Sequence, residues 1–404
     1  MYRQEMYRKA ATILVAVFLG CTMLTAVFAS GTKEGAEAGP IKVGMYADLS
    51  AGTAQWGTDA EKGARLRLKE ANANGGVLGR QVELVIYDCK LSPTEAVKAY
   101  TRLAEQDKVC AVNGSLISNT ALAVSPVAAS LKVPVVSRAM DERATTPQFD
   151  PDNPDDPGPA NPYFFLLQPS AFQQAAVIAG YAIDELGMDT FCMLYNKGNA
   201  YAEYLAKGFA YYVEERGKTM LGSFEFQSGD KDYKAQLTRI KQQAPDGLFI
   251  PNYVTANANA VKQARELGLT TTFLGNNSWY KPMDEVAGEA ADGSYFPNNI
   301  AFDDPSLQWF FDEYEAEYGE EPRLHSFSGW DDMGFMLYAI EKAGSTDPEA
   351  VRDAMEATRE FEGIIGTINI DPDTHRPVGL PMSVLYFDGA EIKTAELKYL
   401  PKAP

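Results

Sequence analysis

The chain is poor in the residues from which metal and nucleophilic sites are built. It contains two histidines and four cysteines among 404 residues. The histidines, His325 and His375, lie in unrelated segments, so a histidine-rich metal site is excluded and both are expected on the surface or in helices. The sequence has no Gly-rich phosphate loop, no Gly-x-Ser-x-Gly elbow and no close Cys/His pair. Because no nucleophile is placed beside a base, we assign no catalytic residue, no metal and no cofactor.

The cysteines are too few for a disulfide framework. Cys21 falls in an N-terminal apolar segment, which leaves Cys89, Cys110 and Cys192. An exported protein that is stapled by disulfides normally carries an even number of cysteines. We therefore expect these three thiols to be reduced and mostly buried.

Long apolar runs are also scarce, and the one that could span a membrane lies at the N-terminus. Three basic residues precede the apolar run 10–29, which ends in small or branched residues suited to a cleavage site. This pattern predicts a secretory signal peptide at 1–29, followed by a linker at 30–40. Two alternatives stay open. One is lipid attachment at Cys21 in a partial lipobox, and the other is an uncleaved anchor, because about 20 apolar residues span a bilayer.

Basic charge is scarce relative to acidic charge. The chain carries 36 Lys and Arg against 55 Asp and Glu, a net charge of -19. Removal of residues 1–29 leaves about -21, because they hold three basic and one acidic side chains. An acidic surface argues against nucleic acid and anionic lipid as partners. The remaining length, about 375 residues, suits two domains of roughly 150–200 residues each.

Strand-like and helix-like segments alternate along most of the chain, which predicts parallel sheets with helices on both faces. The first unit is a strand at 41–46, a helix that stops at an Asn-Gly-Gly sequence at 74–76, and a strand at 81–87. Further strands are predicted at 109–112, 133–137, 163–167, 190–195, 219–226, 247–251 and 272–274. Loops that leave such strands lie at the carboxyl edge of the sheet, where open α/β folds bind ligands.

Two segments depart from this alternation. Residues 141–162 are rich in proline and aspartate and are predicted to form a long exposed loop. Farther on, three helices follow one another without strands, at 305–318, 326–343 and 348–358. The tail, 366–400, is predicted as strands with a hairpin turn at Asp388-Gly389.

Three segments carry a resemblance to a known family. They are 49–57, 70–79 and 82–88, with the sequences LSAGTAQWG, EANANGGVLG and VELVIYD. They resemble the periplasmic leucine/isoleucine/valine-binding family, the type I solute-binding proteins of ABC importers. The resemblance runs, more loosely, from about residue 41 to the C-terminus.

The resemblance implies an α/β fold of two doubly wound parallel-sheet lobes joined by a three-crossing hinge. The crossings would fall near 166–168, 297–299 and 361–366, whereas composition alone would predict two contiguous domains. Lobe 1 would then comprise 41–166 and 299–362, and lobe 2 would comprise 167–298 and 363–404. The family often carries one disulfide in its first lobe, which here would join Cys89 to Cys110. These cysteines are predicted at opposite ends of neighbouring strands, whereas bridged Cα atoms lie within about 7 Å.

Four candidate ligand-binding residues follow strands of lobe 1. Trp56 lies among small residues with nothing nearby to pack against, so a wall over the ligand or an exposed loop aromatic is expected. Ser118 matches the family serine that binds the ligand carboxylate at a helix N-terminus, where the dipole favours an anion, although it could merely cap the helix. Ala139 and Asp141 match a binding alanine backbone and a hydroxyl residue. Asp141 departs from that hydroxyl and would need a cationic partner in the cleft, unless it belongs to the acidic loop.

Three further candidates follow strands of lobe 2. Tyr201 and Tyr253 match the family's cleft tyrosines, although a tyrosine near a strand end is often half-buried packing. Asn277 stands where the amino-acid binders have a glutamate. This departure removes a carboxylate from the ammonium subsite, which Asp141 would restore from the other lobe. The substitution puts branched-chain amino acids in doubt as ligands.

The resemblance implies an extracytoplasmic solute-binding protein without chemistry of its own. It would capture a small polar ligand, an amino acid or a related amide, by hinge closure and deliver it to the permease of an ABC importer. We expect a periplasmic monomer with no nucleic-acid partner. The alternatives are a periplasmic ligand sensor for a signalling partner, a binder of an uncharged amide or urea-like solute, and a secreted enzyme on the same scaffold.

Overall fold

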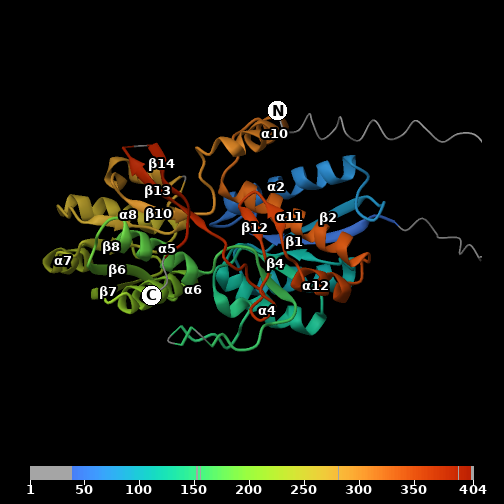
Figure 1. The fold of residues 1–404 in the computed structure, drawn as a ribbon, viewed down its shortest axis with the longest axis horizontal. Helices are drawn as coiled ribbons and strands as arrows, with labels where there is room; N and C mark the ends of the chain where they lie inside the picture. The colour runs from blue at the N-terminus through green and yellow to red at the C-terminus, as the bar shows by residue number, and fades with distance from the viewer. Residues whose placement is uncertain (1–38, 152, 155, 281, 390, 402–404) are drawn as a thin grey trace, which may run out of the picture. The chain divides into compact units, whose positions relative to one another are not determined.

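The structure is a computed structural model that describes residues 39–401 except 152, 155, 281 and 390, and residues 39–404 form one compact unit (Figure 1). The predicted signal peptide, Cys21 and most of the predicted linker lie outside the described residues. Within the described part, no helix has the length and apolar character needed to cross a membrane.

The first sheet is parallel throughout and has the strand order β2-β1-β3-β4-β5. Its strands are β1 (Ile41–Ala47), β2 (Val82–Asp88), β3 (Val112–Asn113), β4 (Val135–Ser137) and β5 (Phe164–Leu166). The helices associated with it are α2 (Ala54–Ala73), α3 (Pro93–Arg102), α4 (Ser118–Leu131), α10 (Gln308–Tyr318), α11 (Leu324–Ala343) and α12 (Pro348–Glu356). We call this sheet and these helices lobe 1. Almost all of β1 is buried, as expected of a strand that helices cover on both faces.

The second sheet has seven strands in the order β14-β13-β10-β9-β8-β6-β7. Its strands are β6 (Thr190–Lys197), β7 (Thr219–Gln227), β8 (Gly247–Phe249), β9 (Thr272–Leu274), β10 (Tyr295–Asn298), β13 (Met382–Asp388) and β14 (Glu391–Tyr399). The helices associated with it are α5 (Ala171–Asp184), α6 (Ala200–Glu215), α7 (Lys234–Gln243), α8 (Val254–Glu266) and α9 (Met283–Ala287). We call this sheet and these helices lobe 2. A separate short hairpin pairs β11 (Phe361–Gly363) with β12 (Gly366–Ile368).

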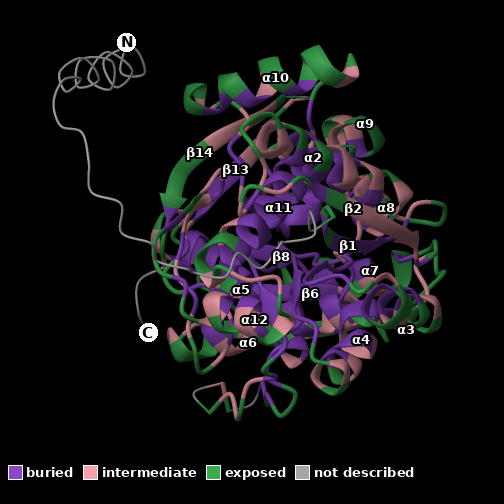
Figure 2. Ribbon diagram, turned by 90° about the vertical axis from the view of Figure 1, so that its right-hand side faces the viewer, coloured by how far each residue is buried: buried purple, intermediate pink, exposed green. Residues whose placement is uncertain are grey.

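The alternation of strands and helices predicted from the sequence is confirmed. Strands β6 to β10 are parallel to one another, and β13 and β14 form the antiparallel hairpin expected around Asp388. Strand β10 was not predicted, because it is only four residues long and contains Pro297, which is unfavourable inside a strand. Buried residues fill β8, the middle of β6 and most of β1 and α11, whereas α10 presents an exposed face (Figure 2).

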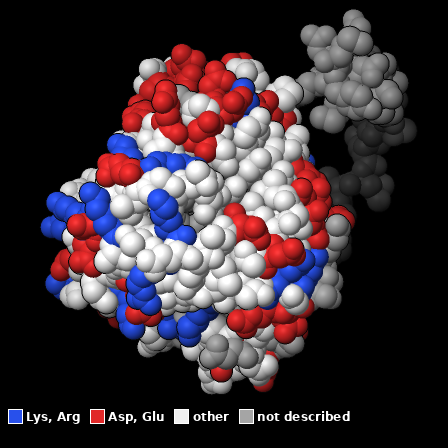
Figure 3. Space-filling model, turned by 90° about the vertical axis from the view of Figure 1, so that its left-hand side faces the viewer, with Lys and Arg blue, Asp and Glu red and all other residues white. Residues whose placement is uncertain are grey.

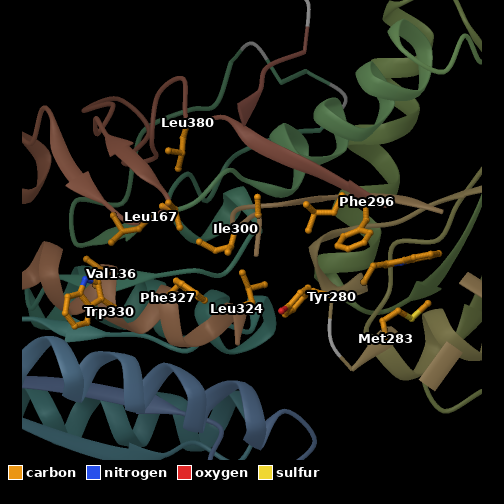
Figure 4. Close-up of a cluster of buried hydrophobic side chains, with 14 of the residues drawn as sticks. Val136, Leu167, Tyr280, Met283, Phe296, Ile300, Leu324, Phe327, Trp330 and Leu380 are labelled. Atoms are coloured by element: carbon orange, nitrogen blue, oxygen red, sulfur yellow. The ribbon is translucent and has the colours of Figure 1, made fainter. Parts of the chain in front are cut away.

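The strands that flank the first predicted crossing, β5 and β6, belong to different sheets, as do β10 and β11, which flank the second. The third predicted crossing coincides with the β11–β12 hairpin, and the lobe boundaries themselves stay a prediction. One buried hydrophobic cluster runs through this region and includes side chains of both lobes. Figure 4 shows Leu167 and Ile300 close to the first two predicted crossings and Leu380 just before β13, with Phe327 on the lobe 1 side and Phe296 on the lobe 2 side. The two sheets therefore share part of one core.

Helices α2 and α11 pack unusually closely because each presents a glycine to the other. A Cβ atom on Gly63 would lie 1.9 Å from the backbone oxygen of Ser326, and one on Gly329 would lie 1.9 Å from that of Ala60. Only glycine allows this approach. The contact holds the N-terminal turn of α11 beside the N-terminal turn of α2, which carries Trp56.

The segment 141–162 does not form the uniformly exposed loop that was predicted. Its first part is buried, including Asp141, Glu142 and Phe149. Phe149 lies edge-on to Phe172 of α5, with ring centroids 5.5 Å apart, and lies 6.2 Å from the ring of Tyr204 in α6. The prediction was wrong for this part because composition does not reveal that a single aromatic anchors the loop to the other lobe.

Cysteine and surface charge follow the expectations from composition. Cys89, Cys110 and Cys192 are free and buried, and burial raises the pKa of their thiols to about 11, about 12 and about 11. No disulfide joins the cysteines of the described residues. Acidic side chains gather in clusters on the face drawn in Figure 3, and basic side chains are grouped elsewhere on the same face.

Candidate functional site

The loops that leave the strands of both lobes meet at two neighbouring cavities. The inner cavity has about 40 Å³ of free volume and the outer one about 760 Å³. The inner cavity is lined from lobe 1 by Trp56, Leu116, Ser118, Arg138, Met140, Leu324 and His325, and from the remainder of the chain by Gln168, Tyr201, Tyr253, Asn277 and Ser278. Six of these residues line the outer cavity too: Trp56, Tyr253, Asn277, Ser278, Leu324 and His325. The two cavities therefore share a wall.

Trp56 is held at this shared wall by a preorganised loop. The carboxylate of Asp48 accepts hydrogen bonds from the backbone N–H groups of Ala51 and Thr53, at 2.8 and 2.7 Å, which fixes the turn before α2. Trp56 lies in the first turn of α2, and its ring meets Tyr253 of lobe 2 edge-on, with centroids 5.6 Å apart. Trp56 thus contacts the opposite lobe, as expected of a residue that covers a ligand.

Tyr201 and Tyr253 form the lobe 2 wall. Their rings stack with centroids 5.7 Å apart. The Tyr201 hydroxyl donates to Asn277 Oδ1 at 2.5 Å and accepts from Asn276 Nδ2 at 3.0 Å. Burial raises the pKa of Tyr201 well above its usual range and that of Tyr253 to about 12, so both phenols are neutral at physiological pH.

Asn277 belongs to a network of neutral amides behind these tyrosines. Its backbone N–H donates to Gln174 Oε1 at 3.1 Å. Asn276 Nδ2 also donates to the backbone oxygen of Asn252 at 3.1 Å, and Ser278 Oγ donates to Asn276 Oδ1 at 2.8 Å. Because amides and hydroxyls make all these bonds, the lobe 2 wall carries no charge at this point.

Ser118 lies at the N-terminal end of α4 and lines the inner cavity. The residue in the cap position is Ile117, and it makes no side-chain cap. The interpretation of Ser118 as a helix cap is therefore wrong, because Ser118 is already the first helical residue. Its Oγ accepts a hydrogen bond from the backbone N–H of Met140 at 3.4 Å, which joins α4 to the end of β4.

Arg138 is a lining residue that the sequence analysis did not select. Its side chain is 1% exposed, and Nε donates to Asp332 Oδ1 of α11 at 2.7 Å. Nη2 lies 3.6 Å from Asp331 Oδ2, and neither Nη1 nor Nη2 makes a hydrogen bond with any described residue. A signal was present in the sequence: two adjacent aspartates in the otherwise apolar α11 require a buried cation.

His325 was also missed, since it was expected on the surface or in a helix with no role in a site. It lies in the first turn of α11, with its ring centroid 5.0 Å from that of Trp56. Burial, and then the charge of Arg138, lower the pKa of His325 to about 3, so the imidazole is neutral. Its Nδ1 is buried and has no hydrogen-bond partner in the described part of the chain.

Ala139 and Asp141 do not line the inner or the outer cavity. Ala139 is buried, and its backbone N–H donates to Ser137 Oγ at 3.0 Å. The carboxylate of Asp141 accepts from Arg143 Nε at 3.0 Å and from Nη2 at 2.6 Å. The Arg143 guanidinium lies 4.1 Å from the ring centroid of Tyr204 in lobe 2. Asp141 therefore has its cation two residues away, and the pair bridges the lobes outside the cavity.

Gln168 connects the cavity to the predicted hinge. Its Nε2 donates to the backbone oxygen of Arg138, and its Oε1 accepts from Asn299 Nδ2 at 2.9 Å. Asp331, the second partner of Arg138, accepts from the backbone N–H groups of Ile364 and Ile365, at 2.7 and 3.2 Å. Arg138 is thus connected to segments at all three predicted crossings.

Two α/β lobes whose strand ends line a shared cavity define a binding protein of the type I periplasmic kind. The chain belongs to the family described as periplasmic binding protein, whose profile matches residues 40–390. A relative from Pseudomonas aeruginosa, a leucine-, isoleucine-, valine-, threonine- and alanine-binding protein, is 25% identical over 357 residues, or 87% of this chain and 91% of the relative. Such relatives are solute-binding proteins rather than enzymes.

Solved structures show the same fold. The branched-chain amino acid transporter substrate-binding protein LivJ from Streptococcus pneumoniae, in complex with isoleucine, has a TM-score of 0.77 and 26% identity, and the match covers 89% of this chain and all of that chain. An ABC transporter solute-binding protein from R. palustris in complex with benzoate has a TM-score of 0.76 and 20% identity, over 91% of this chain and 98% of that chain. The second likeness concerns the fold alone.

Proposed function

We propose that this protein is an extracytoplasmic solute-binding protein that captures a small ligand between its lobes and delivers it to an ABC import permease. The observation that carries the proposal is the inner cavity, which has walls from both lobes. A ligand in contact with both walls favours the closed arrangement over the open one, which is what a closing binding protein requires. The family and the names of the relatives support the same function.

The first candidate ligand is an amino acid or a related amide, because the Pseudomonas aeruginosa and Streptococcus pneumoniae relatives are named for amino acids. A specific observation favours a second candidate, an organic carboxylate without an amino group. Among the described residues that line the inner cavity, Arg138 is charged and none is acidic. The fold is compatible with both classes, since one related structure holds isoleucine and another holds benzoate.

A ligand-library thermal-shift screen on the purified protein tests the binding function. A ligand at about 100 times its Kd stabilises the folded state by about 2.7 kcal/mol, which raises the melting temperature measurably. Small-angle scattering should then give a smaller radius of gyration with ligand than without it. A library of amino acids, amides and organic acids in which no compound raises the melting temperature would contradict the proposal.

Delivery to a permease is tested separately, with the ligand-loaded protein and its cognate importer reconstituted in proteoliposomes. We expect ligand-loaded protein to stimulate ATP hydrolysis by the importer more than ligand-free protein does. If the ligand-loaded protein instead activates a signalling receptor and leaves the importer unaffected, that result would support the sensor alternative. Cell fractionation checks the periplasmic location.

A further inference from the structure

We propose that Arg138 binds the carboxylate of the ligand, and that the ligand is an organic acid with no ammonium group beside that carboxylate. This inference rests on the proposed function, because it names the ligand class of the same cleft. It assigns a specificity-determining role to a residue that none of the segments resembling the family pointed to.

The first argument is the unmet hydrogen-bonding capacity of Arg138. A guanidinium has five N–H donors in a planar fork, which matches the two oxygens of a carboxylate. Asp332 takes Nε, while Nη1 and Nη2 have no hydrogen bond to any residue in the described ranges. A buried charged donor without an acceptor is unfavourable. Because Arg138 lines the inner cavity, a ligand there can supply the missing acceptor.

The other polar groups that line the inner cavity beside Arg138 also suit a carboxylate. Ser118 lines the same cavity from the N-terminal end of α4, a helix of 14 residues whose dipole favours an anion at that end. Gln168 lies on the other side, bonded to the backbone oxygen of Arg138. His325 is neutral and has a buried Nδ1 with no partner among the described residues, so it can donate to or accept from a ligand without adding charge.

No carboxylate of a described residue lines the inner cavity, where it could hold an ammonium group beside the ligand carboxylate; the acidic residues Asp59, Asp230 and Glu285 line the outer cavity instead. Asn277 is neutral, and its side-chain oxygen already accepts from Tyr201. Asp141, which we expected to supply the charge, is occupied by Arg143 outside the cavity. An ammonium group in this space would lose its hydration without gaining a counter-charge, which is strongly unfavourable.

The other residues that line the inner cavity indicate the chemistry of the part of the ligand beyond its carboxylate. Leu116, Met140 and Leu324 are apolar, and the rings of Trp56 and Tyr253 close the space on the outer side. Mostly apolar and aromatic walls with a few converging polar groups are typical of sites for small organic molecules. This lining matches an aromatic or branched aliphatic chain attached to the carboxylate, and because the inner cavity has only about 40 Å³, the chain would extend into the outer cavity of about 760 Å³.

The two aspartates pair with the charge of Arg138 but leave part of its hydrogen-bonding fork without an acceptor. Asp331 is held by the backbone N–H groups of Ile364 and Ile365 and approaches only Nη2. Asp332 bonds Nε through one oxygen, and its other oxygen, Oδ2, is buried without a partner in the described chain. Because Nη1 faces neither aspartate within bonding distance, one end of the fork remains available to a ligand.

The test compares matched ligands on the unaltered protein by isothermal titration calorimetry. One set is 4-methylpentanoate, its amide and leucine, and the other is benzoate, benzamide and phenylglycine. In at least one set we expect the acid to bind about tenfold or more tightly than both its amide, which lacks the charge, and its amino acid, which adds an ammonium group. This comparison does not depend on whether any variant folds.

The variant Arg138→Lys then tests the residue, because lysine keeps the charge but lacks the planar fork. It should weaken binding of the acid by about tenfold to a hundredfold and leave any weak amide binding unchanged. Arg143→Lys, which alters an ion pair outside the cavity, is the matched control and should leave both unchanged. Circular dichroism and the melting temperature report whether each variant is folded.

The outcomes separate this inference from the proposed function. If an amino acid or an amide binds as tightly as the matched acid, or if folded Arg138→Lys binds the acid normally, the inference is wrong and the protein remains a solute-binding protein. The same holds if the library yields a ligand of another class and neither set shows a bound acid. If no compound of any class stabilises the protein, the proposed function itself fails.

Discussion

The two walls of the inner cavity differ in how their polar groups are satisfied. On the lobe 2 wall, Tyr201 and the side chains of Asn276 and Asn277 bond to one another and to the backbone. On the lobe 1 wall, Arg138 Nη1 and Nη2 and His325 Nδ1 have no hydrogen-bond partner in the described chain. The polar groups of the lobe 2 wall are therefore neutral and hydrogen-bonded, whereas the lobe 1 wall contains buried groups that still lack acceptors or donors.

This difference assigns separate tasks to the two lobes. Buried polar groups without partners are unfavourable, and a ligand that satisfies them gains affinity from that relief. The charged end of the ligand should therefore be bound by lobe 1, while lobe 2 closes over the ligand with aromatic rings and neutral donors. The sequence analysis expected Asp141 to restore the carboxylate that Asn277 removes from the ammonium subsite, but Asp141 is paired with Arg143, and the donors without partners belong to Arg138.

The largest effect should come from disrupting the packing of α11 against α2, which supports the lobe 1 wall. Gly329→Val places a side chain against the backbone oxygen of Ala60, which would lie 1.9 Å from Cβ, and forces α11 away from α2. Overpacking of this kind costs about 1–3 kcal/mol and occasionally more, and we expect the upper end. Gly334→Ala is the control, because its Cβ would meet no backbone atom within 4 Å among its nearest neighbours, only the flexible Arg67 side chain at 3.2 Å and the Phe361 ring at 3.4 Å. Equal melting temperatures for the two variants would contradict the close contact.

The next largest effect should come from removing Trp56 from the wall that the two cavities share. Trp56→Ala loses the ring that meets both Tyr253 and His325, so ligand affinity should fall by about tenfold to a hundredfold, the range typical of an aromatic anchor at a binding interface. Trp309→Ala on α10 is the control, because Trp309 is 38% exposed and lines neither cavity. Calorimetric titration measures both. Similar affinities for the two variants would remove Trp56 from the site.

A smaller effect is expected from the lobe 2 wall. Asn277→Ala removes the acceptor of the Tyr201 hydroxyl, but that hydroxyl keeps the hydrogen bond from Asn276. The loss of one neutral hydrogen bond inside the wall costs about 1 kcal/mol, so the affinity for a ligand held against this wall should fall by at most about fivefold. Tyr201→Phe and the double variant complete a thermodynamic cycle. If Asn277→Ala abolishes binding while Arg138→Lys does not, the assignment of tasks to the lobes is reversed.

The lobe 1 wall should also respond to pH. Burial raises the pKa of Asp332 to about 6, against the opposing effect of Arg138, with Asp331 as the other charged neighbour and His325 neutral in this range. An anion bound at Arg138 favours the protonated form of Asp332, so the affinity for the acid should rise about threefold as pH falls from about 7.5 to 5.5. Titrations at several pH values measure this, and Asp332→Asn should flatten the profile. A fall in affinity over this range would contradict the placement of the anion.

The smallest effect should follow from Asp141→Asn. Arg143 already binds this carboxylate, and neither cavity includes it, so the affinity should change by less than about twofold. The pair with Arg143 supports the contact to Tyr204, so a lower melting temperature is expected instead. A loss of affinity by orders of magnitude would return Asp141 to the ligand site and restore the amino-acid reading of the cleft.

The fold was largely predictable because it depends on local patterns. Alternating apolar runs and capped helices are visible in the sequence, and the Asp388 hairpin carried its own turn signal. Strand β10 was not visible, since four residues that include a proline give no period. Phe149 was also invisible as an anchor, because its partners on α5 and α6 lie more than twenty residues away.

The lining of the inner cavity, the candidate site, was predictable only where single residues carry their own signal. Trp56, Ser118, Tyr201, Tyr253 and Asn277 all line the inner cavity. Arg138 was passed over because it stands between Ser137 and Ala139, and its partner Asp332 is 194 residues distant. Asp141 was selected although its cation, Arg143, was only two residues away. Pairing of charges across the fold decides such cases, and one sequence does not show it.

The core that passes between the lobes has a consequence for heat denaturation. Leu167, Ile300 and Leu380 belong to the same buried cluster as Val43 of β1 and Leu194 of β6. Sheets that share a core lose their packing together, so neither lobe gains much by surviving the other. We therefore expect a single calorimetric transition for both lobes, so that a ligand bound in the cleft stabilises the two lobes together.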